Sequence, residues 1–146
     1  MSKTLFIAVV LLFLGYNTAQ ARDERLHFSI EEAMNTPDAK VKLNKGYTFL
    51  FGDSKSTDII ENHGEFQSNK KTNAFGKPDK TACQWAFLSA MLSFQERITT
   101  EGGNAVVNIR SYYKKNDFSS ETEFECGAGG LMAGVTFKGD VVTLKQ

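Results

Sequence analysis

The feature that most constrains the fold is a long segment, residues 80 to 101, whose apolar side chains recur at helical spacing. One stripe repeats at intervals of three or four residues and consists of Cys83, Phe87, Met91, Phe94 and Ile98. Three further apolar residues widen this stripe beyond half of the helix circumference: Trp85, Leu88 and Leu92. Such a helix requires cover on two sides. We therefore expect a sheet on one side and N-terminal helices or another subunit on the other.

Two short helices and two strands are predicted before this long helix. The capping box SIEE at residues 29–32 begins one helix, and the Thr36-Pro37 pair begins a second. Residues 47–52 (YTFLFG) have the aromatic composition of a strand, and we expect both of its faces to be covered. Residues 65–72 show a weaker strand pattern.

The segments NAVVNIRSYY and ETEFEC, which follow the helix, alternate apolar and polar side chains. The polar turn KNDFSS lies between them, so we expect a hairpin in which Ile109 faces Cys126 and Arg110 faces Glu125. The last segment is rich in glycine and finishes as a strand. These patterns predict an α+β fold, in which an antiparallel sheet of about four to five strands packs on one long helix.

The N-terminus has the form of a secretory signal peptide. Lys3 precedes ten apolar residues, Leu5 to Leu14, and an AQA motif ends at Ala21. Ten residues are too few to cross a bilayer, which takes about 20. We expect cleavage between Ala21 and Arg22, which leaves a periplasmic or secreted protein without a stable membrane anchor.

Residues 1–21 are thus assigned to the signal peptide and residues 22–146 to a single domain with nearly balanced charge. The chain has 17 Lys and Arg and 17 Asp and Glu, and loss of Lys3 leaves a net charge of about −1. This balance does not favour nucleic acid as a partner. One local basic cluster is assigned to a solvated face: Lys70, Lys71, Lys77 and Lys80.

The stretch FGKPDKTACQWAF places a Gly-Lys pair ahead of the long helix, as a phosphate-binding loop does. Such a loop also requires a glycine five residues earlier and a hydroxyl after the lysine. Lys71 and Pro78 occupy those two positions. We therefore expect no nucleotide site here.

Cys83 and Cys126 are the two cysteines of the chain. An isolated pair in a small exported domain most often forms a disulfide, which would stabilise the fold by about 4 kcal/mol. The alternative is a reactive thiol, because Cys83 lies in the first turn of a helix, where the helix dipole lowers a thiol pKa. Export favours the disulfide.

No catalytic constellation or cofactor motif emerges from the sequence, so we expect no enzyme activity and no cofactor. His63, near Glu61 and Glu65, is the one candidate for a metal site, and a solvated loop histidine is the interpretation we favour. Glycines in the last segment predict a tight packing seam against the helix or a neighbouring subunit. The candidate residues of this seam are Trp85, Leu88, Leu92, Gly129, Gly130 and Gly134.

Three segments, TNAFGKPDKTACQWAF, EGGNAVVNIRSYYKKN and SSETEFECGAGGLMAGV, resemble a group of small exported bacterial proteins often labelled as an excinuclease ATPase subunit. Because the chain has no Walker A loop, we expect no ATPase activity. The helix followed by GGNAVVNIR is more distantly similar to the G-A-N/D-A-V-V segment of YbjQ-like domains, which also occur in RcsF-type envelope stress sensors.

The resemblance implies an α+β domain with an antiparallel sheet on one main helix. YbjQ-like proteins form pentamers and have been called putative heavy-metal-binding proteins, whereas RcsF-type sensors are disulfide-bonded and contact partner proteins. Our first hypothesis is a non-catalytic, disulfide-stabilised periplasmic domain that binds a protein partner or associates with itself. The alternative is a small-ligand or metal-binding oligomer of the YbjQ-like type.

Overall fold

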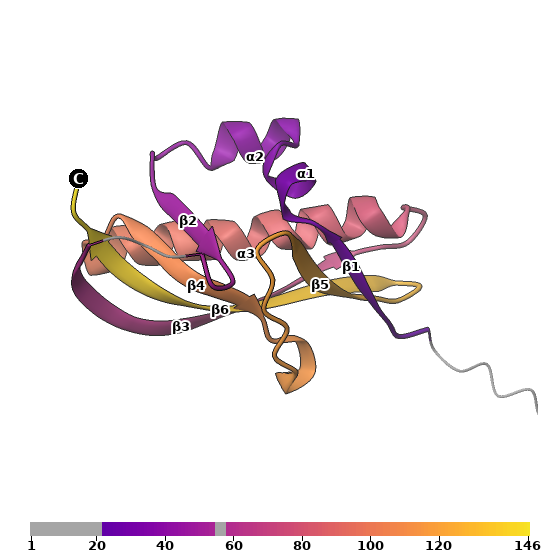
Figure 1. Cartoon of the computed structure of the whole chain (residues 1–146). Coiled ribbons are helices and arrows are strands. Elements are labelled where there is room, and N and C mark those ends of the chain that lie inside the picture. The colour runs from indigo at the N-terminus through magenta and orange to yellow at the C-terminus, as the bar shows by residue number, and fades with distance from the viewer. Residues whose placement is uncertain (1–21, 55–57) are drawn as a thin grey trace, which may run out of the picture.

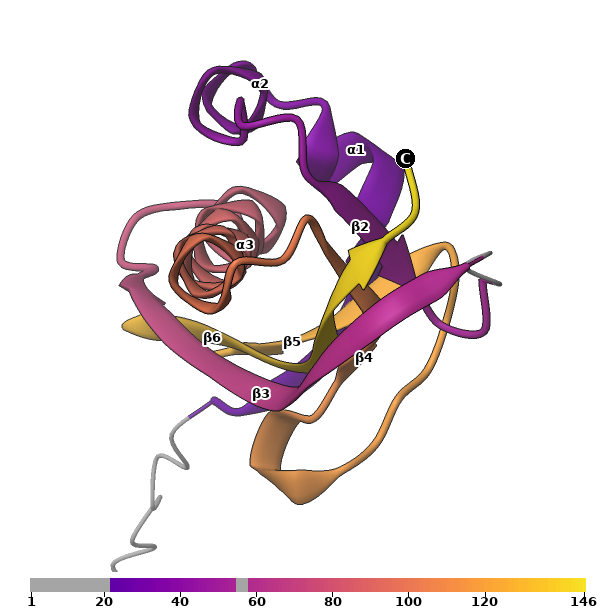
Figure 2. The same ribbon diagram turned by 90° about the vertical axis from the view of Figure 1, so that its left-hand side faces the viewer.

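The computed structural model describes residues 22–54 and 58–146. The predicted signal peptide, with Ala21 at its end, lies outside the described residues. A curved sheet packs against one long helix, and two short helices lie on the other side of that helix (Figures 1 and 2). In chain order the elements are β1 (Glu24–Ser29), α1 (Ile30–Met34), α2 (Pro37–Lys42), β2 (Thr48–Phe51), β3 (Ile59–Asn73), α3 (Asp79–Glu101), β4 (Ala105–Ser111), a 3-10 turn (Tyr113–Lys115), β5 (Glu123–Ala128) and β6 (Met132–Leu144).

The α+β class and the packing of one long helix on the sheet are confirmed. The sheet has six strands in the order β1-β5-β6-β4-β2, and β3 lies along the other edge of β6. Its pairs are antiparallel except for β2 and β4, which are parallel. Parallel neighbours need a long connection, and here β3 and α3 together provide it. The sheet is thus larger than predicted, and it is mixed.

The predicted hairpin is wrong, because β4 and β5 do not pair with each other along a ladder. Both strands pair with β6, which is long enough to accept β5 near Ala133 and β4 farther along, from Phe137 to Val142. Cys126 therefore lies opposite Leu26 of β1. The segment between β4 and β5 makes a single bridge, from Ser111 to Phe118, instead of a tight turn. Local alternation predicts a strand and its two faces, but it does not reveal which strand becomes the partner.

The capping residues in the sequence predicted where the helices begin and end. Ser29 accepts a hydrogen bond from the Glu32 N–H, and Thr36 accepts one from the Ala39 N–H, so both predicted N-caps are confirmed. The long helix α3 ends at Gly102, whose φ of 78° is the left-handed conformation that glycine favours. Hydrophobic periodicity and cap chemistry therefore predicted these elements within about two residues.

The core lies between α3 and the concave face of the sheet (Figure 2). Phenylalanine side chains dominate it: the Phe87 ring centroid lies 4.7 Å from that of Phe124 and 5.6 Å from that of Phe137. On its other side α3 is tied to the N-terminal segment, since the Gln95 amide donates to the Lys42 carbonyl at 3.0 Å. The chain itself therefore covers part of the second face of the helix.

Both faces of strand β2 were expected to be covered. In the structure only its last residue, Phe51, is buried. Phe49 and Leu50 are half-buried, and Thr48 is exposed. As the outermost strand of the path, β2 has one neighbour, β4.

No helix among residues 22–54 and 58–146 is long and apolar enough to cross a membrane.

Candidate functional site

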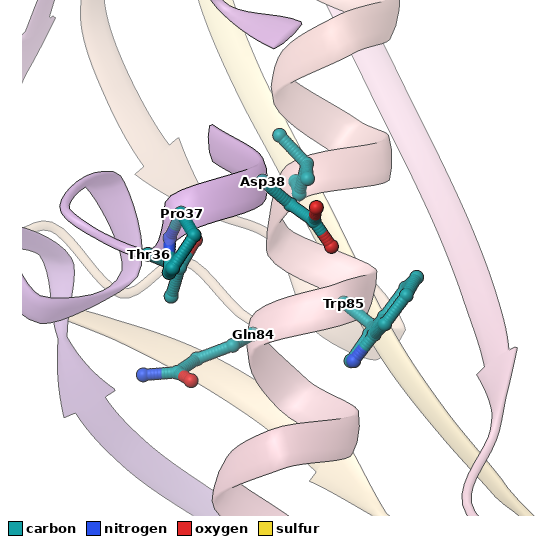
Figure 3. Close-up of a pocket in the computed structure, with 6 residues that line it drawn as sticks. Thr36, Pro37, Asp38, Gln84 and Trp85 are labelled. Carbon is teal, nitrogen blue, oxygen red and sulfur yellow. The ribbon is translucent and has the colours of Figure 1, made fainter. Parts of the chain in front are cut away.

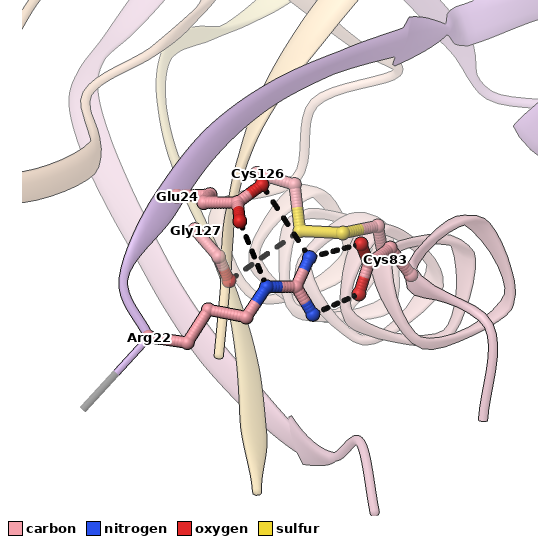
Figure 4. Close-up of polar contacts among 6 residues, drawn as sticks. Arg22, Glu24, Cys83, Cys126 and Gly127 are labelled. Atoms are coloured by element: carbon pink, nitrogen blue, oxygen red, sulfur yellow. Dashed lines mark hydrogen bonds and ion pairs between the residues drawn. A yellow bond between two sulfur atoms is a disulfide. The ribbon is translucent and has the colours of Figure 1, made fainter. Parts of the chain in front are cut away.

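A disulfide joins Cys83 in α3 to Cys126 in β5, as predicted (Figure 4). The two Cα atoms lie 5.9 Å apart, and both residues are fully buried. Neither cysteine is free, so the alternative of a reactive thiol at Cys83 is wrong. A bond between residues so far apart in sequence closes a long loop and holds the start of the helix on the sheet.

Arg22 ties the beginning of the described chain to the same end of α3. Its guanidinium donates to Asp79 Oδ1 at 3.0 Å and to Glu24 Oε1 at 3.0 Å (Figure 4). The hydrogen bond from Arg22 holds the pKa of the Asp79 carboxyl below its usual range. Residue Asp79 lies one helical turn before Cys83, so an ion pair and a disulfide both fasten the first turns of α3.

The second face of α3 carries a hollow of about 230 Å³ beside α2 (Figure 3). Trp85 is 47% exposed there, whereas Leu88 is 5% exposed. Figure 3 shows Asp38 of α2 and Trp85 of α3 on the same side of the hollow. The Lys42 ammonium lies 6.0 Å from the centroid of the Trp85 ring. The residues that line the hollow are Thr36, Pro37, Asp38, Gln84, Trp85 and Leu88.

Val41 lies three residues after Asp38 on α2, about one helical turn along, and is 69% exposed. The α2 helix is short, and its buried contact is Ala39. Exposed aromatic and aliphatic side chains rimmed by polar groups mark surfaces that bind another molecule. We call the surface formed by Asp38, Val41 and Trp85 the α2–α3 face.

The predicted glycine seam is not one surface. Gly129 and Gly130 lie in the turn between β5 and β6, and Gly134 follows on β6, where these glycines line a groove of about 400 Å³. Tyr113 forms one side of this groove. The structure does not bring the glycines to Trp85 or Leu88, which line the hollow beside α2.

Leu92 lies apart from both groups. It is half-buried and lines a separate shallow hollow with Lys70 of β3. The candidate residues of the seam therefore fall on three different parts of the surface.

His63 is held by hydroxyl and carboxylate neighbours. Its Nε2 atom lies 2.9 Å from the Thr143 hydroxyl, and its Nδ1 atom lies 3.9 Å from Glu61 Oε1. Glu65, the other suggested ligand, accepts a hydrogen bond from Arg110 at 2.6 Å. Within residues 22–54 and 58–146, no group of three or more His, Cys, Asp or Glu side chains has the geometry of a metal site.

Sequence reasoning missed a buried carboxylate at Glu125, which is 3% exposed. Its side chain lies 3.2 Å from His27 Nε2 and 3.4 Å from Arg25 Nη1. The ring of Phe118 stacks on His27 with centroids 4.2 Å apart. The alternating segment ERLHFS was the available signal, because a strand there places His27 directly opposite Glu125.

Comparison with protein-family models, with curated proteins and with solved structures found no match for this chain.

Proposed function

We propose that this chain is an exported, non-catalytic domain of the bacterial envelope that binds another protein through the α2–α3 face. The observation that carries the proposal is Trp85, which is 47% exposed beside a hollow in a helix that is otherwise well packed. Tryptophan is enriched among the residues that contribute most to protein interfaces. The buried disulfide supports export, because such bonds persist in oxidising compartments.

The chemistry of the hollow suits recognition better than catalysis. The polar side chains of the hollow are those of Thr36, Asp38 and Gln84. The Thr36 hydroxyl already accepts a hydrogen bond from the Ala39 N–H as the N-cap of α2. Among these lining residues no nucleophile is paired with a base. Asp38 has no cation within ion-pair distance in the part of the chain that the structure describes. The partner surface should thus offer an apolar side chain for Trp85 and a basic one for Asp38.

Site-specific photo-crosslinking tests this proposal. A benzoylphenylalanine replaces Val41 in the chain exported to a bacterial periplasm, and adducts are identified by mass spectrometry. We expect one dominant adduct after irradiation, and we expect Trp85→Ala to abolish it. An adduct of twice the chain mass identifies a second copy of this chain as the partner instead of another protein.

Ile60 is the matched control, because it is 67% exposed on β3, an element that does not line the hollow. A benzoylphenylalanine there should give no adduct of the same mass. The same adducts at both positions, or none at Val41, would overturn the proposal. Retention of the disulfide in each variant shows that the fold is intact.

A further inference from the structure

Three strongly exposed apolar side chains gather at the end of the sheet where β3 ends and β6 begins. Phe75 is 72% exposed, Leu131 is 68% exposed and Met132 is 48% exposed. The backbone fixes them as neighbours, because Asn73 pairs with Met132 and the Ala74 N–H donates to the Leu131 carbonyl at 2.8 Å. We call these three residues the apolar tip.

Basic side chains surround the apolar tip. Lys71 lies opposite Gly134 two positions before the end of β3, and the Lys77 ammonium donates to the Asn73 carbonyl at 3.0 Å. Neither has a carboxylate within 4.0 Å in the described part of the chain.

The carboxylates at this end already contact cations. Asp23 contacts Lys114, and both Glu24 and Asp79 contact Arg22. Four cations therefore stand against three carboxylates: Arg22, Lys71, Lys77 and Lys114 against Asp23, Glu24 and Asp79. The balanced charge of the whole chain conceals this local positive surplus.

The described chain also begins at the apolar tip. Arg22, Leu131 and Met132 line the same groove, and the Arg22 carbonyl lies 3.1 Å from where a Cβ atom of Gly129 would stand. In the sequence only residues 15–21 separate Arg22 from the apolar run Leu5–Leu14. Seven residues span at most about 25 Å when extended. An export signal in residues 1–21, as proposed above, would hold the apolar tip close to the membrane until it is cleaved.

We propose that the apolar tip docks reversibly on the surface of a bilayer that contains anionic phospholipid. Phe75, Leu131 and Met132 enter the boundary between headgroups and acyl chains, while Lys71 and Lys77 contact lipid phosphates. A tip of three side chains offers far less area than the roughly 800 Å² per partner that a stable protein interface buries. A bilayer, in contrast, accepts single apolar side chains from a small surface, and its anionic headgroups match the local charge.

Vesicle co-sedimentation tests the proposal with the processed, disulfide-bonded chain purified from a bacterial periplasm. We expect binding to vesicles of phosphatidylcholine with 30% phosphatidylglycerol, and at least tenfold weaker binding to phosphatidylcholine alone. Phe75→Ser combined with Leu131→Ser should lower the partition coefficient at least tenfold, and Lys71→Glu combined with Lys77→Glu should do the same. Binding should also weaken in 0.5 M NaCl.

The matched controls are Ile60→Ser, an equally exposed apolar position on β3, and Lys40→Glu combined with Lys45→Glu. These variants should bind vesicles as the unmodified chain does. No binding to anionic vesicles, or equal losses in the tip variants and the controls, would overturn the proposal.

A second measurement does not depend on loss of binding. Trp85 is the one tryptophan of the chain, so Leu131→Trp in a Trp85→Phe background reports on the tip alone. Its fluorescence emission should shift to shorter wavelength when anionic vesicles are added, and brominated lipids should quench it. An unchanged emission spectrum would contradict insertion of the tip.

Discussion

The ring of Tyr113 lies against Gly127 of β5, where a Cβ atom added to the glycine would stand 2.0 Å from the ring carbon Cζ. Gly134, on the adjacent strand, would place a Cβ atom 3.5 Å from the same ring. The two glycines thus let the Tyr113 ring approach the backbone of β5 and β6 closely. Burial raises the pKa of the Tyr113 hydroxyl, and the nearby Asp23 carboxylate raises it further.

Gly127→Ala should destabilise the protein by about 1–2 kcal/mol, because the new methyl group displaces the Tyr113 ring from its packed position. Urea denaturation at pH 7 measures the change in the free energy of unfolding. In a Tyr113→Ala background the cost of Gly127→Ala should fall below about 0.5 kcal/mol. The control is Gly130→Ala, since a Cβ atom there meets no other atom within 4 Å. Equal costs in both backgrounds would contradict the role of Tyr113.

Replacement of both cysteines, Cys83→Ala with Cys126→Ala, should lower the free energy of unfolding by about 2–5 kcal/mol. The bond joins residues 43 positions apart, so it restricts the unfolded chain strongly. Because both cysteines are fully buried, dithiothreitol should reduce the native protein slowly and the urea-unfolded protein quickly. Thiol alkylation followed by mass spectrometry measures both rates, and rapid reduction of the native protein would contradict the buried position.

The disulfide and the long helix could be predicted from the sequence, whereas the sheet order could not. Hydrophobic spacing and a glycine cap are local signals, and they located α3 and its end at Gly102. Strand β1 was missed although ERLHFS alternates, because Leu26 and Phe28 are the only apolar residues in this short segment. The buried position of Glu125 depended on that strand. Of the α2–α3 face, only Trp85 was among the candidate residues predicted from the sequence, because the place of α2 is set by tertiary packing.

Glu65 should titrate below its usual range. Arg110 Nη2 donates to Glu65 Oε2 at 2.6 Å, and this hydrogen bond lowers the pKa of the carboxyl. A folded-state pKa below the unfolded value of about 4.3 stabilises the protein above that pH, and the contribution is lost as the pH falls through the folded-state pKa. Carbon-detected NMR titration of the Glu65 carboxyl measures the shift, and Arg110→Ala should reverse it.

The stability that accompanies this shift is small, because the Glu65 side chain is 46% exposed and solvent screens the pair. Glu65→Gln should lower the free energy of unfolding by about 0.5 kcal/mol at pH 7 and by much less at pH 3. Glu121→Gln is the control, since this exposed carboxylate has no cation within ion-pair distance among residues 22–54 and 58–146. A Glu65 cost that does not depend on pH would contradict the ion pair.

Trp85→Ala and Leu88→Ala should separate binding from stability on the same face of α3. Leu88 is 5% exposed, and its truncation should cost about 2–4 kcal/mol of unfolding free energy. Trp85 is 47% exposed, so its truncation should cost less than about 1 kcal/mol while it abolishes the cross-link from Val41. Differential scanning calorimetry and the cross-linking yield measure the two effects. A cost for Trp85→Ala as large as that for Leu88→Ala would assign the tryptophan to the core and leave the α2–α3 face without its principal binding residue.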